Sequence, residues 1–202
     1  MFYDTETNAH GMSHDPFKAI VAPRPIGWIG TRGRDGSINL SPYSFFNIVS
    51  DTPKIIMFSS TGRKDSLRNA EETGVFTASL ASRHLAEAVN ASSVTVPYGT
   101  DEFALAGVTP APGTLVDAPY VAEAYTALEC RVTEILQPHT LKGGKAPSYM
   151  VFGEVVGIHI REEVIRDGRI DMALLRPIAR MGYRDFSDGG AEVFELTRPA
   201  GP

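Results

Sequence analysis

Small hydroxyl and basic side chains gather around one expected helix start. The hydroxyl and basic residues are Ser59, Ser60, Thr61, Arg63, Lys64 and Ser66, and Gly62, Asp65 and Asn69 lie among them. The first N–H groups of a helix are unpaired and the helix dipole is positive there, so an anion is attracted to such a point. The pattern predicts a phosphate site. The alternative is an ordinary strand–turn–helix joint with solvated charges.

A second chemical pattern lies upstream, where hydroxyls and a proline stand among aromatic residues. The run consists of Ser41, Pro42, Tyr43, Ser44, Phe45, Phe46 and Asn47, and Trp28 precedes it. Because Pro42 cannot donate a backbone hydrogen bond, the segment is expected to bend away from regular pairing and free backbone groups for a ligand. Its hydroxyls and amides suit the polar edge of a flat ring, and its aromatic side chains, with Trp28, suit the ring face. Alternatively, Phe45 and Phe46 are core residues and the proline marks a plain turn.

A flat ring that carries a phosphate describes flavin mononucleotide (FMN), which is the cofactor that these residues predict. Towards the C-terminus, Arg180 lies among apolar residues. A guanidinium group suits planar oxyanions, so Arg180 is expected to reach an anionic group of the cofactor or of a substrate. The alternative for Arg180 is a surface ion pair.

Other kinds of catalytic site find no support in the residue pattern. The five histidines lack the spacing of a metal site, and His159, within an apolar strand, is expected to be structural. The sequence has no Gly-x-Ser-x-Gly or Walker motif, and its lone cysteine, Cys130, lies in a strand pattern. We therefore predict no metal and no catalytic side chain, and expect a bound organic cofactor to supply the chemistry.

Composition narrows the range of partners and locations. A length of 202 residues with 43% hydrophobic content favours one domain. The net charge of -5 argues against nucleic acid as a partner. Apolar runs are shorter than the roughly 20 residues that cross a bilayer, the first residues show no secretory signal, and one cysteine cannot form a disulfide framework. We expect a cytoplasmic protein without a membrane partner.

The elements that must position these residues are mostly strands. Fourteen prolines and nineteen glycines divide the chain into short pieces, which favours β structure with turns. Strand-like runs cover residues 26–31, 38–40, 54–59, 75–79, 127–136 and 149–160. Asp35-Gly36 predicts a tight turn that pairs the first two runs antiparallel.

Helices are expected at three places. Asp65 and Ser66 open a helix over residues 67–72 that Gly74 ends, and Ser82 caps a second over 83–91. A short third helix covers 173–178. Residues 99–117 show little periodicity and are expected to form a long surface excursion, either a plain loop or a cover over a ligand.

Several segments, in this order, resemble the flavin reductase-like, FMN-binding split-barrel family. The resemblance is closest to the branch that includes nitrilotriacetate monooxygenase component B and flavoredoxin. The matching segments cover residues 24–31, 39–47, 63–66 with Asn69, 128–130, 153–156 with His159, and 168–180. The combination spans nearly the whole chain.

The resemblance implies a mainly β fold, an antiparallel split barrel of Greek-key type with a few peripheral helices. It also implies one domain over residues 1–202, with an arm over about 1–15, a tail over about 187–202, and a homodimer that holds FMN near its interface. The segment from Ser41 to Asn47 would border the ring. Ser59, Ser60, Lys64 and Ser66 would surround the phosphate, with Arg63 and Arg180 as further members.

Family reductases pass a hydride from NADH or NADPH to the flavin, so the resemblance implies a reductase that supplies reduced flavin to a partner monooxygenase. Many members carry Gly-Asp-His where this chain has Gly153-Glu154-Val155, and relatives tend to have a tyrosine where Phe186 stands. Two alternatives therefore stay open. They are a flavoredoxin-like electron carrier with another redox partner and a non-enzymatic flavin-binding protein.

Overall fold

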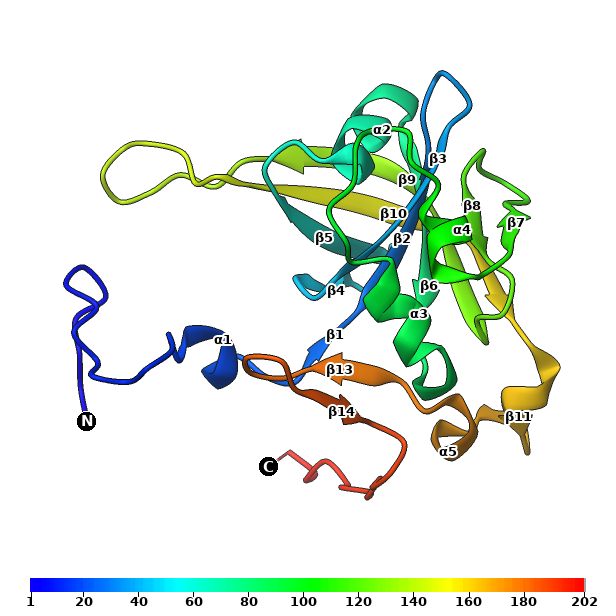
Figure 1. Cartoon of the computed structure of the whole chain (residues 1–202). Helices are drawn as coiled ribbons and strands as arrows, with labels where there is room; N and C mark the ends of the chain where they lie inside the picture. The colour runs from blue at the N-terminus through cyan, green and yellow to red at the C-terminus, as the bar shows by residue number, and fades with distance from the viewer. Residues whose placement is uncertain (202) are drawn as a thin grey trace.

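The computed structural model describes residues 1–201, and strands make up most of its regular structure (Figure 1). The helices are α1 (Phe17–Ile20), α2 (Asp65–Thr73), α3 (Ala86–Ala91), α4 (Glu102–Ala106) and α5 (Met172–Leu175), with the 3-10 helices η1 (Arg83–Leu85) and η2 (Glu162–Val164). The strands are β1 (Arg24–Pro25), β2 (Gly27–Arg32), β3 (Ile38–Tyr43), β4 (Phe46–Ser50), β5 (Ile55–Thr61), β6 (Val75–Leu80), β7 (Pro110–Pro112), β8 (Pro119–Val121), β9 (Thr126–Leu136), β10 (Ser148–Ile160), β11 (Ile165–Arg166), β12 (Arg169–Ile170), β13 (Ile178–Arg180) and β14 (Phe186–Asp188).

Seven of these strands form one antiparallel sheet in the order β3-β2-β6-β9-β10-β5-β4. All six predicted strands belong to it. The predicted turn between β2 and β3 is present, and Gly36 there has a φ of 87°, which glycine adopts without strain. The sheet curls into a half-barrel, so the predicted mainly β split barrel with few helices is confirmed.

The two edges of the curled sheet are joined by a very short connection. Edge strand β3 ends at Tyr43 and the opposite edge strand β4 begins at Phe46, so only Ser44 and Phe45 lie between them. The carbonyl of Phe45 also accepts a hydrogen bond of 2.8 Å from the N–H of Ser59 at the end of β5. This link holds the two edges near each other and leaves the barrel split beside it.

Pro42 does not divert the chain from regular pairing as expected. It lies opposite Trp28 within β3, and pairing continues to Tyr43. Because β3 is an edge strand, the N–H that proline lacks is not needed by a further neighbour. The departure from the sheet therefore begins at Ser44.

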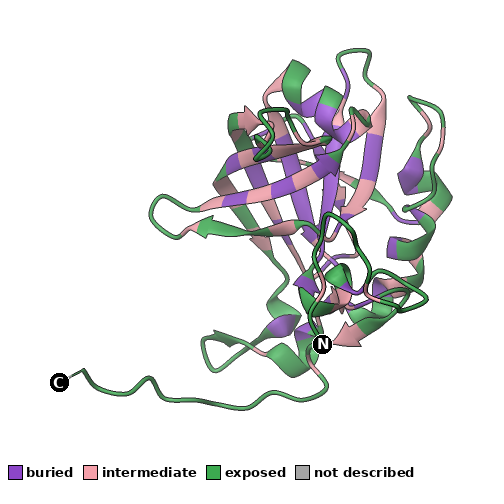
Figure 2. Ribbon diagram, turned by 90° about the vertical axis from the view of Figure 1, so that its left-hand side faces the viewer, coloured by how far each residue is buried: buried purple, intermediate pink, exposed green. Residues whose placement is uncertain are grey.

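The core consists of two clusters on the two faces of the sheet. One contains Trp28 and Phe103 beneath α3 and α4, and the other, inside the half-barrel, contains Phe58 and Phe76. Figure 2 shows buried positions along the strands of the large sheet and exposed positions along the C-terminal segment. Cys130 is fully buried in the second cluster, where burial raises the pKa of its thiol.

A separate small sheet lies next to the half-barrel and joins distant parts of the chain. Its order is β1-β13-β14, and Arg24 of β1 lies opposite Arg180 of β13. Figure 1 shows α1 at the left-hand end of this sheet. Strand β14 includes Ser187 and Asp188, so the segment predicted as a tail starts inside a strand.

Two helices start without the side-chain caps that were expected, and one unexpected helix lies within residues 99–117. Helix α2 ends at Gly74 with a φ of 74° as predicted, but its N-cap is Lys64 and no side chain caps it. Ser82 likewise caps nothing through its side chain, and η1 precedes α3. Residues 99–117 are not a plain loop, because they contain α4, whose start is capped by Asp101, and β7. A five-residue helix is too short to show a periodic pattern.

The end of this excursion is fastened by one buried carboxylate. Glu129 accepts hydrogen bonds from the N–H groups of Thr114, Leu115 and Val116 at 2.8, 2.6 and 2.9 Å. His159 Nε2 lies 2.5 Å from the same carboxylate, which supports the structural role predicted for this histidine. Burial alone would raise the pKa of Glu129, but these hydrogen bonds outweigh burial and the pKa is lowered.

Within residues 1–201, no helix combines the length and apolar character required to cross a membrane, and no group of three or more histidine, cysteine or acidic side chains could hold a metal ion.

Glu129→Gln is expected to reduce the free energy of unfolding by about 2 kcal/mol at neutral pH, because an amide cannot accept from all three N–H groups. A lowered pKa means that the carboxylate stabilises the fold above its ordinary pKa of 4.5 and loses this effect as pH falls through the folded-state value. The loss caused by the substitution should therefore shrink in acid. Urea unfolding at several pH values measures it, with the exposed Glu154→Gln as control. An equal loss at every pH would contradict this account.

Candidate functional site

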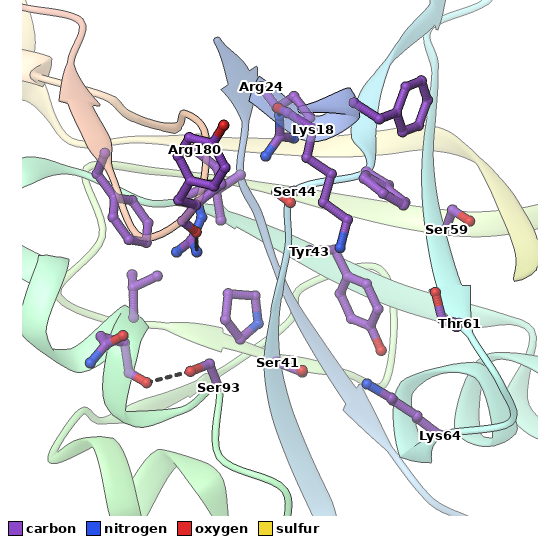
Figure 3. Close-up of a pocket in the computed structure, with 18 of the residues that line it drawn as sticks. Lys18, Arg24, Ser41, Tyr43, Ser44, Ser59, Thr61, Lys64, Ser93 and Arg180 are labelled. Atoms are coloured by element: carbon purple, nitrogen blue, oxygen red, sulfur yellow. Dashed lines mark hydrogen bonds between the residues drawn. The ribbon is translucent and has the colours of Figure 1, made fainter. Parts of the chain in front are cut away.

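A pocket of about 630 Å³ opens where the split in the half-barrel meets the small sheet (Figure 3). Eight predicted site residues line it, namely Ser41, Pro42, Tyr43, Ser44, Phe45, Ser59, Lys64 and Arg180. The structure therefore brings the predicted ring segment and part of the predicted phosphate cluster to one cavity. It does so because β3 and β5 end side by side at the link through Ser44 and Phe45.

One end of the pocket is polar and contains a cation. Figure 3 shows the amine of Lys64 and the hydroxyl of Tyr43 near Ser41 and Thr61. Lys64 makes no ion pair with the described residues, and it is the N-cap of the nine-residue helix α2. The side chains of this end and the uncapped helix start provide cationic and N–H groups for an anion.

Tyr43 presents a buried polar atom without a partner. The residue is only 7% exposed, and its hydroxyl makes no hydrogen bond within residues 1–201. Burial raises the pKa of the Tyr43 phenol, and the nearby hydroxyls of Ser66, Ser60 and Ser41 offset this only in part. A buried hydroxyl without a partner costs free energy, so an acceptor or donor on a ligand would satisfy it.

Three predicted contacts, Ser60, Ser66 and Asn69, lie beneath the pocket and do not line it. Ser66 Oγ accepts a hydrogen bond of 2.9 Å from Asn39, and Asn69 Nδ2 donates to Thr31 Oγ1 at 3.0 Å. The hydroxyl of Ser60 donates to the carbonyl of Gly62 at 3.0 Å. These residues fix the start of α2 and the turn before it, and so position Lys64.

Trp28, predicted to contact a ring, does not line the pocket. Its side chain is completely buried in the core, and its indole N–H donates to Ser92 Oγ at 2.8 Å. Successive residues of a strand point to opposite faces, and β2 is apolar on both, so the sequence did not reveal which face Trp28 takes.

Asn47, Arg63 and Asp65 do not line the pocket either. Asn47 is exposed on β4 and accepts from the N–H of Ile48 at 2.9 Å. Arg63 turns towards α2 and forms an ion pair with Glu71. Asp65 is half-buried, and burial raises its pKa.

The other wall of the pocket was not predicted. It contains Asp15, Phe17, Lys18, Arg24, Ile26, Val89, Asn90, Ser93, Tyr183 and Phe186. Most of these residues belong to the N-terminal segment, α3 and the small sheet, which meet only through the long-range pairing of β1 with β13. In the sequence, Arg24 stands just before an apolar strand, which could have marked it as a candidate site residue. Nothing in the sequence indicates that its strand pairs with β13.

Comparison with known proteins identifies the family. Residues 21–175 match the family profile described as "Flavin reductase like domain". The chain belongs to the flavin reductase-like family. The protein BH2278 of Halalkalibacterium halodurans is 35% identical over 185 residues, which cover 89% of this chain and 87% of that relative.

Solved structures of this flavin reductase-like family share the fold over nearly the full length. Nitrilotriacetate monooxygenase component B from Bacillus cereus superposes with a TM-score of 0.87 and 28% identity, covering 97% of this chain and 98% of the other. Flavoredoxin of Desulfovibrio vulgaris (Miyazaki F) superposes with a TM-score of 0.75 and 27% identity, covering 89% and 92%. The flavin reductase-like chain is thus a member of a flavin-related oxidoreductase family.

Tyr43→Phe is expected to leave the free energy of unfolding of the ligand-free protein within about 0.5 kcal/mol of the original, because the hydroxyl makes no hydrogen bond to lose. Trp28→Phe serves as the contrast, since it removes a hydrogen bond and leaves a cavity, and should cost about 2 kcal/mol or more. Urea unfolding measures both variants. A loss for Tyr43→Phe as large as that for Trp28→Phe would show that the hydroxyl has a partner in the protein.

Proposed function

We propose that this protein is an FMN-dependent oxidoreductase of the cytoplasm, most simply an NAD(P)H-dependent flavin reductase that supplies reduced flavin to a partner monooxygenase. The observation that carries the proposal is the pocket itself. It joins the segment from Ser41 to Phe45, the cationic start of α2 at Lys64, and the unpartnered hydroxyl of Tyr43.

The lining residues fit FMN in two parts. Lys64, Ser59 and Thr61 would hold the phosphate beside the start of α2, since a cation, hydroxyls and free helix N–H groups favour an anion there. Ser41, Ser44 and Tyr43 would meet the polar atoms of the ring system and its side chain, and Phe45 would cover apolar ring surface. The flavin, when bound, supplies two-electron transfer between a donor and an acceptor. The residues of the pocket orient it and keep water away from one face.

The surface next to the pocket supports a homodimer as part of this proposal. Ile48 and Val49 on β4 are 69% and 48% exposed, and Phe45 beside them is 37% exposed. An exposed apolar strand at a sheet edge favours association, and a second copy seated there would place the cofactor near the interface.

A flavoredoxin-like electron carrier is the second candidate, favoured by the departure at Gly153-Glu154-Val155 from the motif linked to nicotinamide use. These residues lie inside β10. A Cβ on Gly153 would approach Phe76 to 2.4 Å, so packing alone explains the glycine. Stopped-flow mixing of the FMN-loaded protein with NADH and with NADPH separates the two functions. Rapid bleaching of the flavin indicates a reductase, and slow bleaching by both nicotinamides indicates a carrier reduced by another protein.

The visible spectrum of the purified protein with and without added FMN tests the cofactor directly. Flavin absorbance or saturable binding is expected. The absence of both would overturn the proposal. A ring covered on both faces in an FMN-bound structure would instead indicate a flavin-binding protein without reductase activity.

Lys64→Ala is expected to weaken FMN binding about tenfold or more and to leave riboflavin binding nearly unchanged, because riboflavin has no phosphate. Arg63→Ala is the matched control, since Arg63 is a neighbouring cation already paired with Glu71. Fluorescence titration with both ligands measures the effect. Equal losses for FMN and riboflavin would exclude the phosphate role of Lys64.

A further inference from the structure

Three cations besides Lys64 line the pocket. Lys18 comes from α1, Arg24 from β1 and Arg180 from β13. Arg24 and Arg180 lie directly opposite each other in the β1–β13 pair. In Figure 3 Arg24 and Arg180 lie near Ser44, at the other end of the β3 segment from Lys64, and the side chain of Lys18 extends past Ser44 towards Tyr43.

Arg24 is a buried cation without a counter-charge. It is 8% exposed, and its guanidinium donates to the carbonyls of Lys18 and Val21 and, at 2.9 Å, to that of Met181. Its Nε has no partner in the described part of the chain, and no carboxylate there lies within ion-pair distance. Burial and the nearby charge of Arg180 lower the pKa of Arg24. Burial of a charge is costly unless an opposite charge accompanies it.

The neighbouring cations are also without ionic partners among residues 1–201. Arg180 donates to the carbonyl of Tyr183 and lies over the ring of Phe186 at 4.5 Å. Asp15 is the one carboxylate that lines the described pocket, and it accepts from the N–H of Phe17 and pairs with none of the three cations. Other arginines do have carboxylate partners, namely Arg32 with Asp117, Arg63 with Glu71, Arg161 with Glu163 and Arg176 with Asp188. Lys18, Arg24 and Arg180 thus line one pocket without a carboxylate partner among the described residues.

Apolar surface adjoins these cations. Phe17 directly precedes Lys18 in the chain, Phe186 lies under Arg180, and both line the pocket with Tyr183; Phe17, Phe186 and Tyr183 are 62%, 41% and 48% exposed. Exposed aromatic rings beside cationic groups suit a ligand with a planar apolar body and one anionic group.

We propose that Lys18 and Arg180, held in place by Arg24, form an oxyanion site for the carboxylate or phosphate of a second ligand, the molecule that exchanges electrons with the flavin. The ligand class is a planar organic anion. This inference rests on the proposed function, because it assigns the FMN phosphate to Lys64 and leaves the second cationic group for another molecule. Arg24 is a positioning residue, since its donors are engaged by the backbone of α1 and of the segment after β13.

Isothermal titration calorimetry of the FMN-loaded protein with benzoate and with neutral benzamide tests the site. Benzoate should bind more tightly, and Arg180→Gln should weaken benzoate binding about tenfold or more without changing benzamide binding. Lys18→Gln should weaken it about threefold, since this side chain is more exposed. Arg166→Gln, which removes an exposed arginine outside the pocket, is the control and should change nothing.

Nicotinamide mononucleotide and nicotinamide riboside, which differ by one phosphate, form the second arm. Dependence on Arg180 in this arm alone identifies a phosphate ligand, and dependence in the benzoate arm alone identifies a carboxylate ligand.

If Arg180→Gln behaves like Arg166→Gln in both arms, there is no oxyanion site. If it weakens FMN more than riboflavin and spares both probes, the anion at this wall is the FMN phosphate and the inference is overturned. If the protein binds no FMN yet prefers benzoate through Arg180, the oxyanion site stands and the proposed function fails.

Discussion

The short link between β3 and β4 is the constraint on which the rest of the structure depends. Two residues, Ser44 and Phe45, must connect opposite edges of a seven-stranded sheet, so the sheet has to curl until those edges meet. The hydrogen bond from Ser59 to Phe45 secures this arrangement. The curl brings the end of β5 and the start of α2 beside the end of β3. A cationic helix start and a segment of hydroxyls and aromatics thereby become two parts of one cavity.

Local patterns in the sequence predicted every strand of the large sheet except β4, and about half of the candidate site. The apolar runs that became β2, β9 and β10 are long or flanked by clear turn residues, so their strands were predictable. The side of a strand or helix that faces the ligand was harder to predict. Trp28 belongs to a strand that is apolar on both faces, and Ser66 and Asn69 belong to the inner side of α2. The types of these residues suited a flavin site, but their positions on the strand and the helix direct their side chains into the protein interior.

The second wall of the pocket was beyond local patterns for a different reason. It forms when a two-residue strand near the N-terminus pairs with a three-residue strand more than 150 positions later, as the contact of Arg24 with Met181 shows. Strands this short carry almost no periodic signal. Arg180 was recognised as a candidate because a guanidinium among apolar residues is informative alone. Lys18 and Arg24 could not be assigned to this site from the sequence, because they reach the pocket only through the long-range pairing of β1 with β13.

The attachment of α1 has a consequence for how molecules enter and leave. This four-residue helix buries none of its own residues, and the carbonyls of Lys18 and Val21 are fastened to the buried guanidinium of Arg24. A segment with so little apolar contact opens at a lower free-energy cost than the strands behind it. The N-terminal wall is therefore expected to open locally while the half-barrel stays folded, which would let a molecule enter or leave the pocket without global unfolding. The guanidinium group of Arg24 thus has two effects: it adds positive charge to this wall, and its hydrogen bonds hold α1 against the small sheet.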